Sequence, residues 1–273
     1  QVLRAIRERH PNTLEVVAIN DLTDTKTNAH MFKYDTNYGV SPETVEFTEN
    51  SIIVGGYPIS VLAERDPSNL PWGKLGVDIV IESTGFFTSG DKASGHIKGG
   101  AKKVIISAPA KGEDIMVVLG VNENEYDPNK HHVLSNASCT TNCIAPVAKV
   151  INDRFEIKKG LMSTIHAYTN DQNILDQVHG DLRRARTAAA NIVPTSTGAA
   201  RAVGLALPEL KGRIHGMAYR VPTTTVSIVD FTAEIGGSTS VEEINQAFLD
   251  AASNQLNGIL DYSEEPLVSS DYR

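Results

Sequence analysis

The chain has 273 residues, 41% of them hydrophobic, which is enough for the cores of about two domains. Its formal net charge is −8 and no block of Lys and Arg stands out, so no nucleic-acid surface is expected. Two cysteines in a chain of this length favour a reducing, cytoplasmic compartment, and no run approaches the roughly 18 apolar residues of a membrane span.

The first 21 residues have the pattern of the second half of a dinucleotide-binding βαβ unit. Residues 2–9 are predicted to form a helix and residues 14–19 a short strand, which is followed by Asn20 and Asp21. An acidic residue at the carboxyl end of that strand can accept hydrogen bonds from an adenosine ribose. Asp21 is therefore a candidate cofactor ligand, although an acidic residue in a solvated turn is the commoner role. We expect the glycine-rich first half of the unit to precede Gln1.

Apolar β-type runs continue through the first half of the chain. Gly55 and Gly56 separate two of them, residues 51–54 and 59–62, which predicts a tight hairpin. Further runs lie at residues 77–82, 103–107, 115–118 and 133–134. Their alternation with helical or loop segments predicts a largely parallel sheet. Several end in small polar residues, and ligands of open α/β sheets bind at such carboxyl ends.

The segment SNASCTTNC, residues 135–143, opens a long helical pattern. Apolar residues recur on one face of that helix: Ile144, Val147, Ala148, Ile151 and Phe155. Ser138 and Thr140 suit the cap and first turn, so Cys139 is expected at a helix N-terminus, which favours the nucleophilic thiolate. A buried, inert thiol is the alternative, and we expect it for Cys143, one turn later. Without a second Cys pair the two residues make no zinc site, and no metal is predicted.

Beyond this helix the pattern changes to longer strands. They are expected over residues 160–168, 214–220 and 224–234. A helix over residues 241–252 begins with a capping box of Ser240 and Glu243. This order predicts an α+β domain with a mostly antiparallel sheet. Residues 171–194 are too long for a simple connection, and their arginines indicate either an anion site or a subunit-contact face.

A cysteine nucleophile needs a base, and His166 is the best candidate among the eight histidines. It lies in an apolar strand with small polar neighbours, whereas the other histidines occupy polar, loop or turn contexts. A histidine in a strand is more often structural, so the assignment requires that His166 lie close to Cys139.

Motifs along nearly the whole chain resemble those of the phosphorylating glyceraldehyde-3-phosphate dehydrogenases, of the bacterial-like type. The most specific are SNASCTTNC at residues 135–143 and TIHAYTN at residues 164–170. Others follow in the family's order: AINDL at 18–22, AERDP at 63–67, ESTGFF at 82–87, ISAPAK at 106–111, DLRRAR at 181–186, PTSTGAAR at 194–201, RVPT at 220–223 and YSEEPLVSSDY at 262–272.

The resemblance implies a role for each matching residue. Cys139 matches the nucleophile and His166 the general base. Positions that hold the attacking or the substrate phosphate are matched by Ser138, Thr140, Thr197, Gly198 and Arg220, with Thr169 and Arg184 as further substrate-phosphate contacts. Asp21 matches the ribose-binding acid, and Arg65 and Ser107 match cofactor-contacting positions.

The implied fold is α/β. A Rossmann-type NAD-binding domain over residues 1–137 is followed by an α+β catalytic domain over residues 138–273. The implied reaction oxidises D-glyceraldehyde 3-phosphate with NAD through a Cys139 thioester, and inorganic phosphate releases 1,3-bisphosphoglycerate. In this family the segment 171–194 lies between the subunits of a cytoplasmic homotetramer, so a homotetramer is expected here.

The sequence departs from the family pattern in three places. The family has a glycine-rich turn and a first strand near its N-terminus and a helix at its C-terminus. These elements would lie outside residues 1–273. We therefore expect this chain by itself to be inactive and poorly soluble, and to bind NAD weakly or not at all. Gln177 and Val178 stand where NAD-specific members often carry a proline, so NADP remains a second candidate cofactor.

Three alternatives remain open. Erythrose-4-phosphate dehydrogenase is the nearest neighbour within the family, although Thr197 and Gly198 favour the glyceraldehyde-phosphate enzyme. A Cys/His acyl hydrolase or transferase would need no dinucleotide domain. An inactive interaction protein would need neither Cys139 nor His166.

Overall fold

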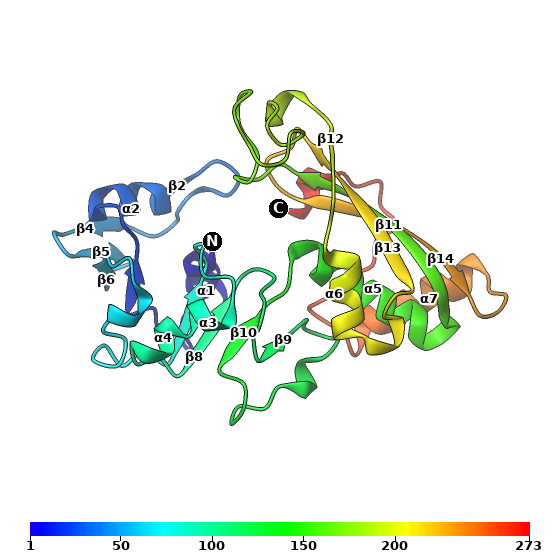
Figure 1. Cartoon of the computed structure of the whole chain (residues 1–273), viewed down its shortest axis with the longest axis horizontal. Coiled ribbons are helices and arrows are strands. Elements are labelled where there is room, and N and C mark those ends of the chain that lie inside the picture. Colours follow the sequence, from blue (N-terminus) through cyan, green and yellow to red (C-terminus); the bar gives the residue numbers. More distant parts are fainter. The chain divides into compact units, whose positions relative to one another are not determined.

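The computed structural model describes all 273 residues, and the chain divides into two compact units, Gln1–Ile105 and Ile106–Arg273 (Figure 1). Helix α1 (Val2–Arg9) opens the first unit, as predicted. No helix combines the length and the apolar character that crossing a bilayer requires.

A four-stranded sheet organises the beginning of the first unit. Its strands lie in the order β1 (Ala18–Asn20), β6 (Tyr57–Leu62), β5 (Ser51–Val54) and β4 (Val45–Phe47). Strand β1 is parallel to β6, whereas β6, β5 and β4 are antiparallel neighbours. Helix α2 (Thr25–Lys33) packs on β4 and β5, where Ala29, Ile52 and Val54 are buried. Only the first pair of this sheet is parallel. The prediction of a largely parallel sheet concerned the later runs over residues 77–134, where residues 115–116 pair in parallel with residues 134–135.

The predicted hairpin connects β5 to β6. Gly55 and Gly56 have φ values of 58° and 84°, a left-handed conformation that glycine adopts without steric cost. A second, smaller antiparallel pair joins β2 (Tyr34–Asp35) to β3 (Gly39–Val40). Local turn chemistry therefore determines the connections in this part of the chain.

The rest of the first unit holds the strands β7 (Ile79–Glu82) and β8 (Lys103–Ile106), which are neighbours in a second sheet. Between them lie the short helices α3 (Gly90–Ala93) and α4 (Gly95–Lys98). Helix α4 packs on the 3₁₀ turn η1 (Pro67–Asn69). A strand–helix–strand order of this kind is typical of dinucleotide-binding folds.

The second unit contains a four-stranded mixed sheet. Its order is β12 (Val193–Thr195), β13 (Ile214–Val221), β11 (Ile157–Ala167) and β14 (Ser227–Ile235). Strands β11 and β13 are parallel, while the pairs β11–β14 and β12–β13 are antiparallel. Two of the three pairs thus have the antiparallel arrangement that the sequence predicted.

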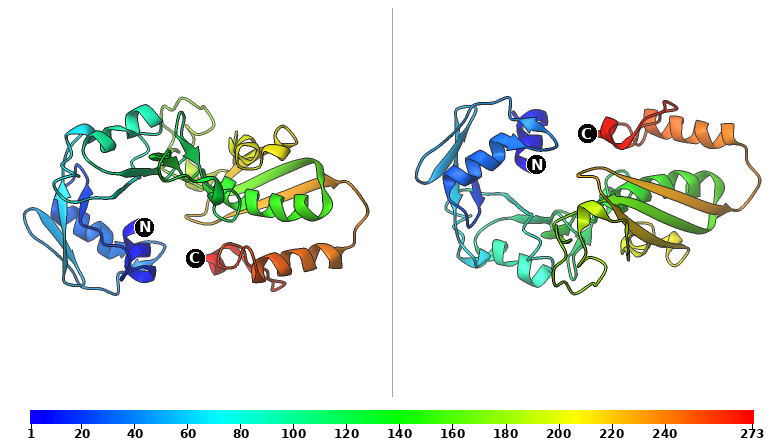
Figure 2. Two further views of the ribbon diagram at one scale, coloured as in Figure 1. Left: turned by 90° about the horizontal axis from the view of Figure 1, so that it is seen from below. Right: turned by 90° about the horizontal axis from the view of Figure 1, so that it is seen from above.

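Helices cover one face of this sheet (Figures 1 and 2). Helix α5 (Cys139–Phe155) packs against α6 (Ala199–Ala206) and against β11 and β14. Their contact buries Ile144, Ala148 and Val203 in the main core of the unit. Helix α7 (Val241–Ser253) packs on α5 and starts with the predicted capping box.

Shorter elements complete the second unit. Strands β9 (Ile115–Met116) and β10 (Val133–Ser135) form a parallel pair, and the turns η2 (Glu123–Glu125), η3 (Ala188–Ala190), η4 (Pro208–Leu210) and η5 (Ser269–Tyr272) are 3₁₀. Strand β10 leads directly into α5, so this parallel pair positions the N-terminus of the helix that carries Cys139.

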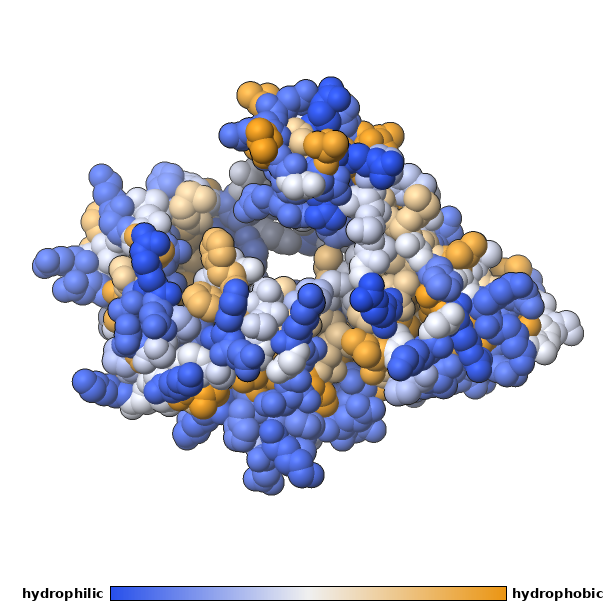
Figure 3. Space-filling view, viewed as in Figure 1, coloured by the Kyte–Doolittle hydropathy of each residue, from blue (hydrophilic) through white to orange (hydrophobic).

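The segment between β11 and β12 is irregular, apart from η3, and exposes apolar side chains. These appear as orange atoms in the upper part of Figure 3. Those with the largest exposed fractions are Val178 at 97%, Leu182 at 82% and Leu175 at 72%. Exposed apolar side chains gathered on one segment are typical of a protein–protein contact.

Candidate active site

Cys139 is the first residue of α5, as predicted, and the turn that precedes it is strained. Ser138 is the N-cap, and its Oγ accepts a hydrogen bond from the N–H of Thr141 at 3.0 Å. Ala137 has a φ of 55°, a left-handed conformation that is uncommon for a residue with a Cβ. The Oγ of Ser135 accepts the N–H of Ala137 at 3.1 Å and supports this conformation. Cys139 therefore lies where the free N–H groups of a first turn favour negative charge.

The thiol of Cys139 is paired with the imidazole of His166. The distance from Sγ to Nε2 is 3.1 Å, although the two residues are 27 positions apart in the chain. The hydrogen bond to His166 lowers the pKa of Cys139 to about 7, against an opposing contribution from burial; the charge of His166 and hydrogen bonds with Thr140 also lower it. The thiol therefore ionises far more readily than an ordinary cysteine, and the ionised form is the nucleophile.

Strand β11 presents His166, and Arg220 of β13 fixes the other side of its ring. The two residues are partners in the parallel β11–β13 register. Arg220 Nη1 lies 2.8 Å from His166 Nδ1 and 3.0 Å from the carbonyl oxygen of Ala167, which itself lies 2.6 Å from Nδ1. When Nδ1 accepts from Arg220, the proton of a neutral imidazole is on Nε2 and faces the sulfur. When Nδ1–H donates to Ala167, Nε2 is free to take a proton.

A group of cationic and hydroxyl side chains adjoins this pair. Arg220 Nη1 lies 3.4 Å from Thr169 Oγ1, and the buried Nε of Arg220 has no hydrogen-bond partner. Burial, and next the charge of Arg184, lower the pKa of Arg220. Two guanidinium groups close enough to repel one another favour binding of an anion, and an anion would also satisfy the unpaired N–H.

Arg184 is held in place by two residues that the sequence analysis missed. Its Nε and Nη2 donate to Thr195 Oγ1 at 3.1 and 2.8 Å, and its Nη1 forms an ion pair with Asp171. Asp171 follows directly after the motif TIHAYTN, which was the available sequence signal. For Thr195 the only signal is its place in PTSTGAAR.

The remaining predicted phosphate-binding residues lie near two helix N-termini. Ser138 and the buried Thr140 belong to the first turn of α5. Gly198 is the N-cap of α6, and Thr197 Oγ1 accepts the N–H of Ala199 at 3.2 Å. Direct hydrogen bonds join Cys139, His166, Arg220 and Thr169, whereas no hydrogen bond joins Thr197 or Gly198 to that group.

Cys143 differs from the prediction, because the structure places it at the surface instead of in the core. It lies one turn after Cys139 on α5. Desolvation by neighbouring atoms and the charge of Cys139 raise its pKa. Cys143 is therefore exposed but a weaker nucleophile than Cys139.

Two of the predicted cofactor ligands lie in the first unit, at the end of the β1–β6 pair. The N–H of Asp21 donates to the carbonyl oxygen of Leu62 at 2.9 Å, and the side chain of Asn20 bonds both the N–H and the carbonyl of Glu64. Asn20 thereby holds the loop that carries the exposed Arg65 beside Asp21.

Asp21 has the chemistry that an adenosine ribose requires. Its Oδ1 accepts the N–H of Thr23 at 2.8 Å, and the exposed carboxylate keeps Oδ2 available for a ribose hydroxyl. The third predicted ligand, Ser107, is exposed in the second unit directly after β8. Within the first unit, Asp21 therefore fits the ribose of a dinucleotide.

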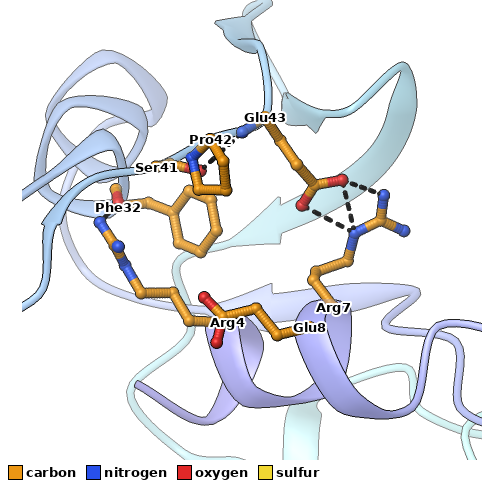
Figure 4. Close-up of a pocket in the computed structure, with 7 residues that line it drawn as sticks. All are labelled: Arg4, Arg7, Glu8, Phe32, Ser41, Pro42 and Glu43. Atoms are coloured by element: carbon orange, nitrogen blue, oxygen red, sulfur yellow. Dashed lines mark hydrogen bonds and ion pairs between the residues drawn. The ribbon is translucent and has the colours of Figure 1, made fainter. Parts of the chain in front are cut away.

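A separate hollow of about 230 Å³ lies beneath α1 in the first unit (Figure 4). Arg7 forms an ion pair with Glu43 across it. Arg4 donates to the carbonyl oxygen of Phe32 at 2.6 Å. Both guanidinium groups therefore anchor α1 to the chain around it, and we assign the hollow a structural role.

Comparison with known proteins gives two matches that together cover most of the chain. Residues 1–90 match the NAD binding domain of glyceraldehyde 3-phosphate dehydrogenase, and residues 138–273 match its C-terminal domain. The chain belongs to the glyceraldehyde-3-phosphate dehydrogenase family. The resemblance, the predicted fold class and the predicted NAD cofactor are confirmed by these matches.

Relatives of known function agree with this membership. The chain is 60% identical over 259 residues to glyceraldehyde-3-phosphate dehydrogenase of Geobacillus stearothermophilus. The aligned segment covers 95% of this chain and 77% of that relative. The chain is 61% identical over 259 residues to glyceraldehyde-3-phosphate dehydrogenase 1 of Bacillus cereus, covering 95% and 78%. It is 58% identical over 269 residues to the enzyme of Streptomyces coelicolor, covering 98% and 80%. The prediction of a glycolytic, NAD-dependent oxidoreductase is confirmed, and the alternatives are not favoured.

Proposed function

We propose that the Cys139–His166 pair carries out the phosphorylating oxidation of D-glyceraldehyde 3-phosphate. The observation that carries this proposal is the 3.1 Å contact between Sγ and Nε2 in a chain of the glyceraldehyde-3-phosphate dehydrogenase family. A thiol with a pKa of about 7 beside a histidine supplies both the nucleophile and the proton acceptor. Residues 1–137 form the cofactor domain and residues 138–273 the catalytic domain.

The first step is addition of the Cys139 thiolate to the aldehyde carbon, while the carbonyl oxygen takes the proton that the thiol had passed to His166 Nε2, which gives a hemithioacetal. Nε2 of His166 takes the proton of the new hydroxyl as the carbon is oxidised. NAD, when bound, supplies the acceptor for the hydride. Carbon–oxygen double-bond formation then leaves a thioester on Cys139.

The second step is attack of inorganic phosphate on that thioester. Arg220 and Arg184, with Thr169, bind phosphate groups through charge-assisted hydrogen bonds, and Ser138, Thr140, Thr197 and Gly198 complete the phosphate sites. The Cys139 thiolate is the leaving group, and its low pKa makes it a good one. The acyl phosphate is released, and the free thiolate is ready for the next cycle.

Binding of the cofactor is assigned to Asp21, Arg65 and Ser107. Support for Asp21 comes from its exposed carboxylate at the end of β1. A carboxylate at this place accepts ribose hydroxyls and repels a 2′-phosphate, so we propose NAD over NADP.

We further propose a cytoplasmic homotetramer without membrane or nucleic-acid partners. The exposed Val178, Leu182 and Leu175 support a subunit contact through the segment between β11 and β12. The net charge of −8 supports the absence of a nucleic-acid surface.

The proposed reaction is tested on the full-length enzyme by following NADH at 340 nm with D-glyceraldehyde 3-phosphate, with and without inorganic phosphate. We expect turnover to require phosphate, and mass spectrometry without phosphate to detect an acyl group on Cys139. Phosphate-independent turnover, or an acyl group on another residue, would contradict the proposal. D-erythrose 4-phosphate is the comparison substrate and should give a lower kcat/KM.

A further inference from the structure

A chain of buried hydrogen bonds in the first unit is not explained by the reaction described above. Trp72, Glu82 and His96 are each only 4% exposed. Trp72 Nε1 lies 3.0 Å from His96 Nδ1, and His96 Nε2 lies 2.9 Å from Glu82 Oε2. The three side chains come from separate segments, since Glu82 ends β7 and His96 lies in α4.

The partners fix the tautomer of this histidine. An indole N–H can only donate, so Nδ1 of His96 must accept, and the proton of the neutral ring is on Nε2. That proton points at Glu82 Oε2. Although burial alone would raise the pKa of Glu82, hydrogen bonds from His96 and Thr84 hold it below the ordinary value. Glu82 is therefore a buried carboxylate, and both of its oxygens accept hydrogen bonds.

The second oxygen of Glu82 holds the loop that follows β7. Oε1 accepts the N–H of Thr84 at 2.7 Å and the hydroxyl of Thr84 at 2.5 Å. Thr84 Oγ1 in turn accepts the N–H of Phe86 at 3.1 Å. The ring of Phe87 packs edge-on against His96, with 6.3 Å between the ring centroids. Glu82 therefore bonds Thr84 near the start of the loop, and His96 packs against Phe87 at its end.

The loop that follows β7 is exposed, and it carries a large apolar side chain, Phe86, which is unusual in a solvated turn. Residues 83–86 are all exposed, and Phe86 is exposed at 78%. Gly85 between them has a φ of 78°, which a residue with a side chain rarely adopts. The loop stands at the carboxyl end of β7, where α/β sheets bind their ligands. Burying a carboxylate is costly, so a purely stabilising contact would be better made by apolar side chains.

We propose that Glu82 and His96, supported by Trp72, are positioning residues that fix the loop 83–87 in the conformation that binds the dinucleotide cofactor. The inference rests on the proposed function for the identity of the cofactor. Neither residue touches the reacting atoms. Their effect is to order, before binding, the backbone groups of Thr84 and Gly85 and the ring of Phe86, so that the cofactor does not have to order them.

The first test compares Glu82→Gln with Thr84→Val. Glu82→Gln keeps the size of the side chain, but an amide has a single acceptor oxygen, so it cannot accept from both His96 and the N–H of Thr84. Thr84→Val keeps the hydrogen bond between His96 and Glu82 and removes the hydroxyl that bonds both Glu82 and the N–H of Phe86. Calorimetry with NAD should show Kd raised by about tenfold or more in both, since misplaced binding groups lose much of their binding energy. KM for NAD should rise more than kcat falls.

A second readout separates positioning from damage to the fold. The rate at which iodoacetamide alkylates Cys139 in the absence of NAD should stay within about twofold of wild type, because Cys139 lies in the other unit. Trp72→Phe should partly rescue Glu82→Gln, because His96 can then move its proton to Nδ1 and accept the new amide at Nε2. Glu123→Gln, an exposed carboxylate in η2, is the matched control and should leave Kd unchanged.

The outcome that overturns the inference is an NAD Kd within about twofold of wild type in Thr84→Val. Should Glu82→Gln fail to fold, Thr84→Val decides alone, because it keeps the hydrogen bonds of Glu82 with His96 and with the N–H of Thr84. Failure of the proposed function would appear differently, as wild-type enzyme that binds NAD but does not reduce it with D-glyceraldehyde 3-phosphate.

Discussion

Arg220 and His166 are direct partners in the parallel pairing of β11 with β13, and Arg220 Nη1 lies 2.8 Å from His166 Nδ1. One guanidinium therefore contacts the base on the side opposite the nucleophile and also reaches Thr169. Proton transfer and phosphate binding share this side chain, so changes at Arg220 should affect both.

Replacing Arg220 with Gln should weaken phosphate binding and reduce turnover. A hydrogen bond to a charged group contributes about 1.5–3 kcal/mol, which corresponds to a rise of about tenfold or more in KM for phosphate. Loss of the nearby positive charge should also raise the pKa of Cys139. Steady-state kinetics over a range of phosphate concentrations measures the first effect. Arg154→Gln, which removes an exposed ion pair on α5, is the control.

The reactivity of Cys139 should depend on pH with a midpoint near 7. Its pKa is lowered to about 7 from an ordinary value of 9.0, so the thiolate persists below the pH at which a free thiol is protonated. His166→Gln should move the alkylation midpoint upward, because the hydrogen bond to His166 is the largest cause of the lowered pKa. Iodoacetamide rates from pH 5 to 10 give both midpoints, and equal midpoints would contradict the assigned role of His166.

The two cysteines should respond differently to substitution by serine. Cys139→Ser should abolish acyl-enzyme formation, since a hydroxyl cannot form a thioester and ionises far less readily. Cys143→Ser should retain most activity, because the raised pKa of Cys143 keeps it protonated at pH 7. Mass spectrometry after brief iodoacetamide treatment should find the label first on Cys139. Similar loss of turnover in both variants would contradict this division of roles.

Asp21→Ala should increase the use of NADP relative to NAD. The carboxylate of Asp21 repels a 2′-phosphate and accepts the ribose hydroxyls, so its loss weakens NAD binding and removes the repulsion. The ratio of kcat/KM for the two cofactors measures the change. If wild-type enzyme already uses both equally, Gln177 and Val178 matter more than Asp21, and the NAD preference proposed here is wrong.

Val178→Glu and Leu182→Glu should dissociate the proposed tetramer. Both side chains are exposed on the segment between β11 and β12, and a buried unpaired carboxylate in a subunit contact is strongly unfavourable. Light scattering coupled to gel filtration gives the mass of the assembly, with Glu123→Lys as a surface control. Wild-type enzyme that is a fully active monomer would rule the assembly out.

Local sequence determined much of what positions the site. The cap at Ser138, the capping box of Ser240 with Glu243 and the Gly55-Gly56 hairpin are all formed as predicted. Each depends on backbone groups within a few residues, so residue type at fixed spacing is sufficient. Predicted strands were displaced at their ends, since residues 14–17 lie outside β1 and residues 117–118 outside β9. Strand ends depend on the partner strand, which a local pattern does not contain.

Only the tertiary structure decided which distant side chains meet. The sequence indicated Cys139 and His166 as separate candidates, but their 3.1 Å contact requires α5 to pack against β11. Cys143 is exposed, which its helical position alone did not predict. The partners of Arg184, and the buried connection from Trp72 through His96 to Glu82, join residues far apart in the chain. Such contacts follow from strand register and helix packing, because these bring together residues whose spacing in the sequence has no fixed period.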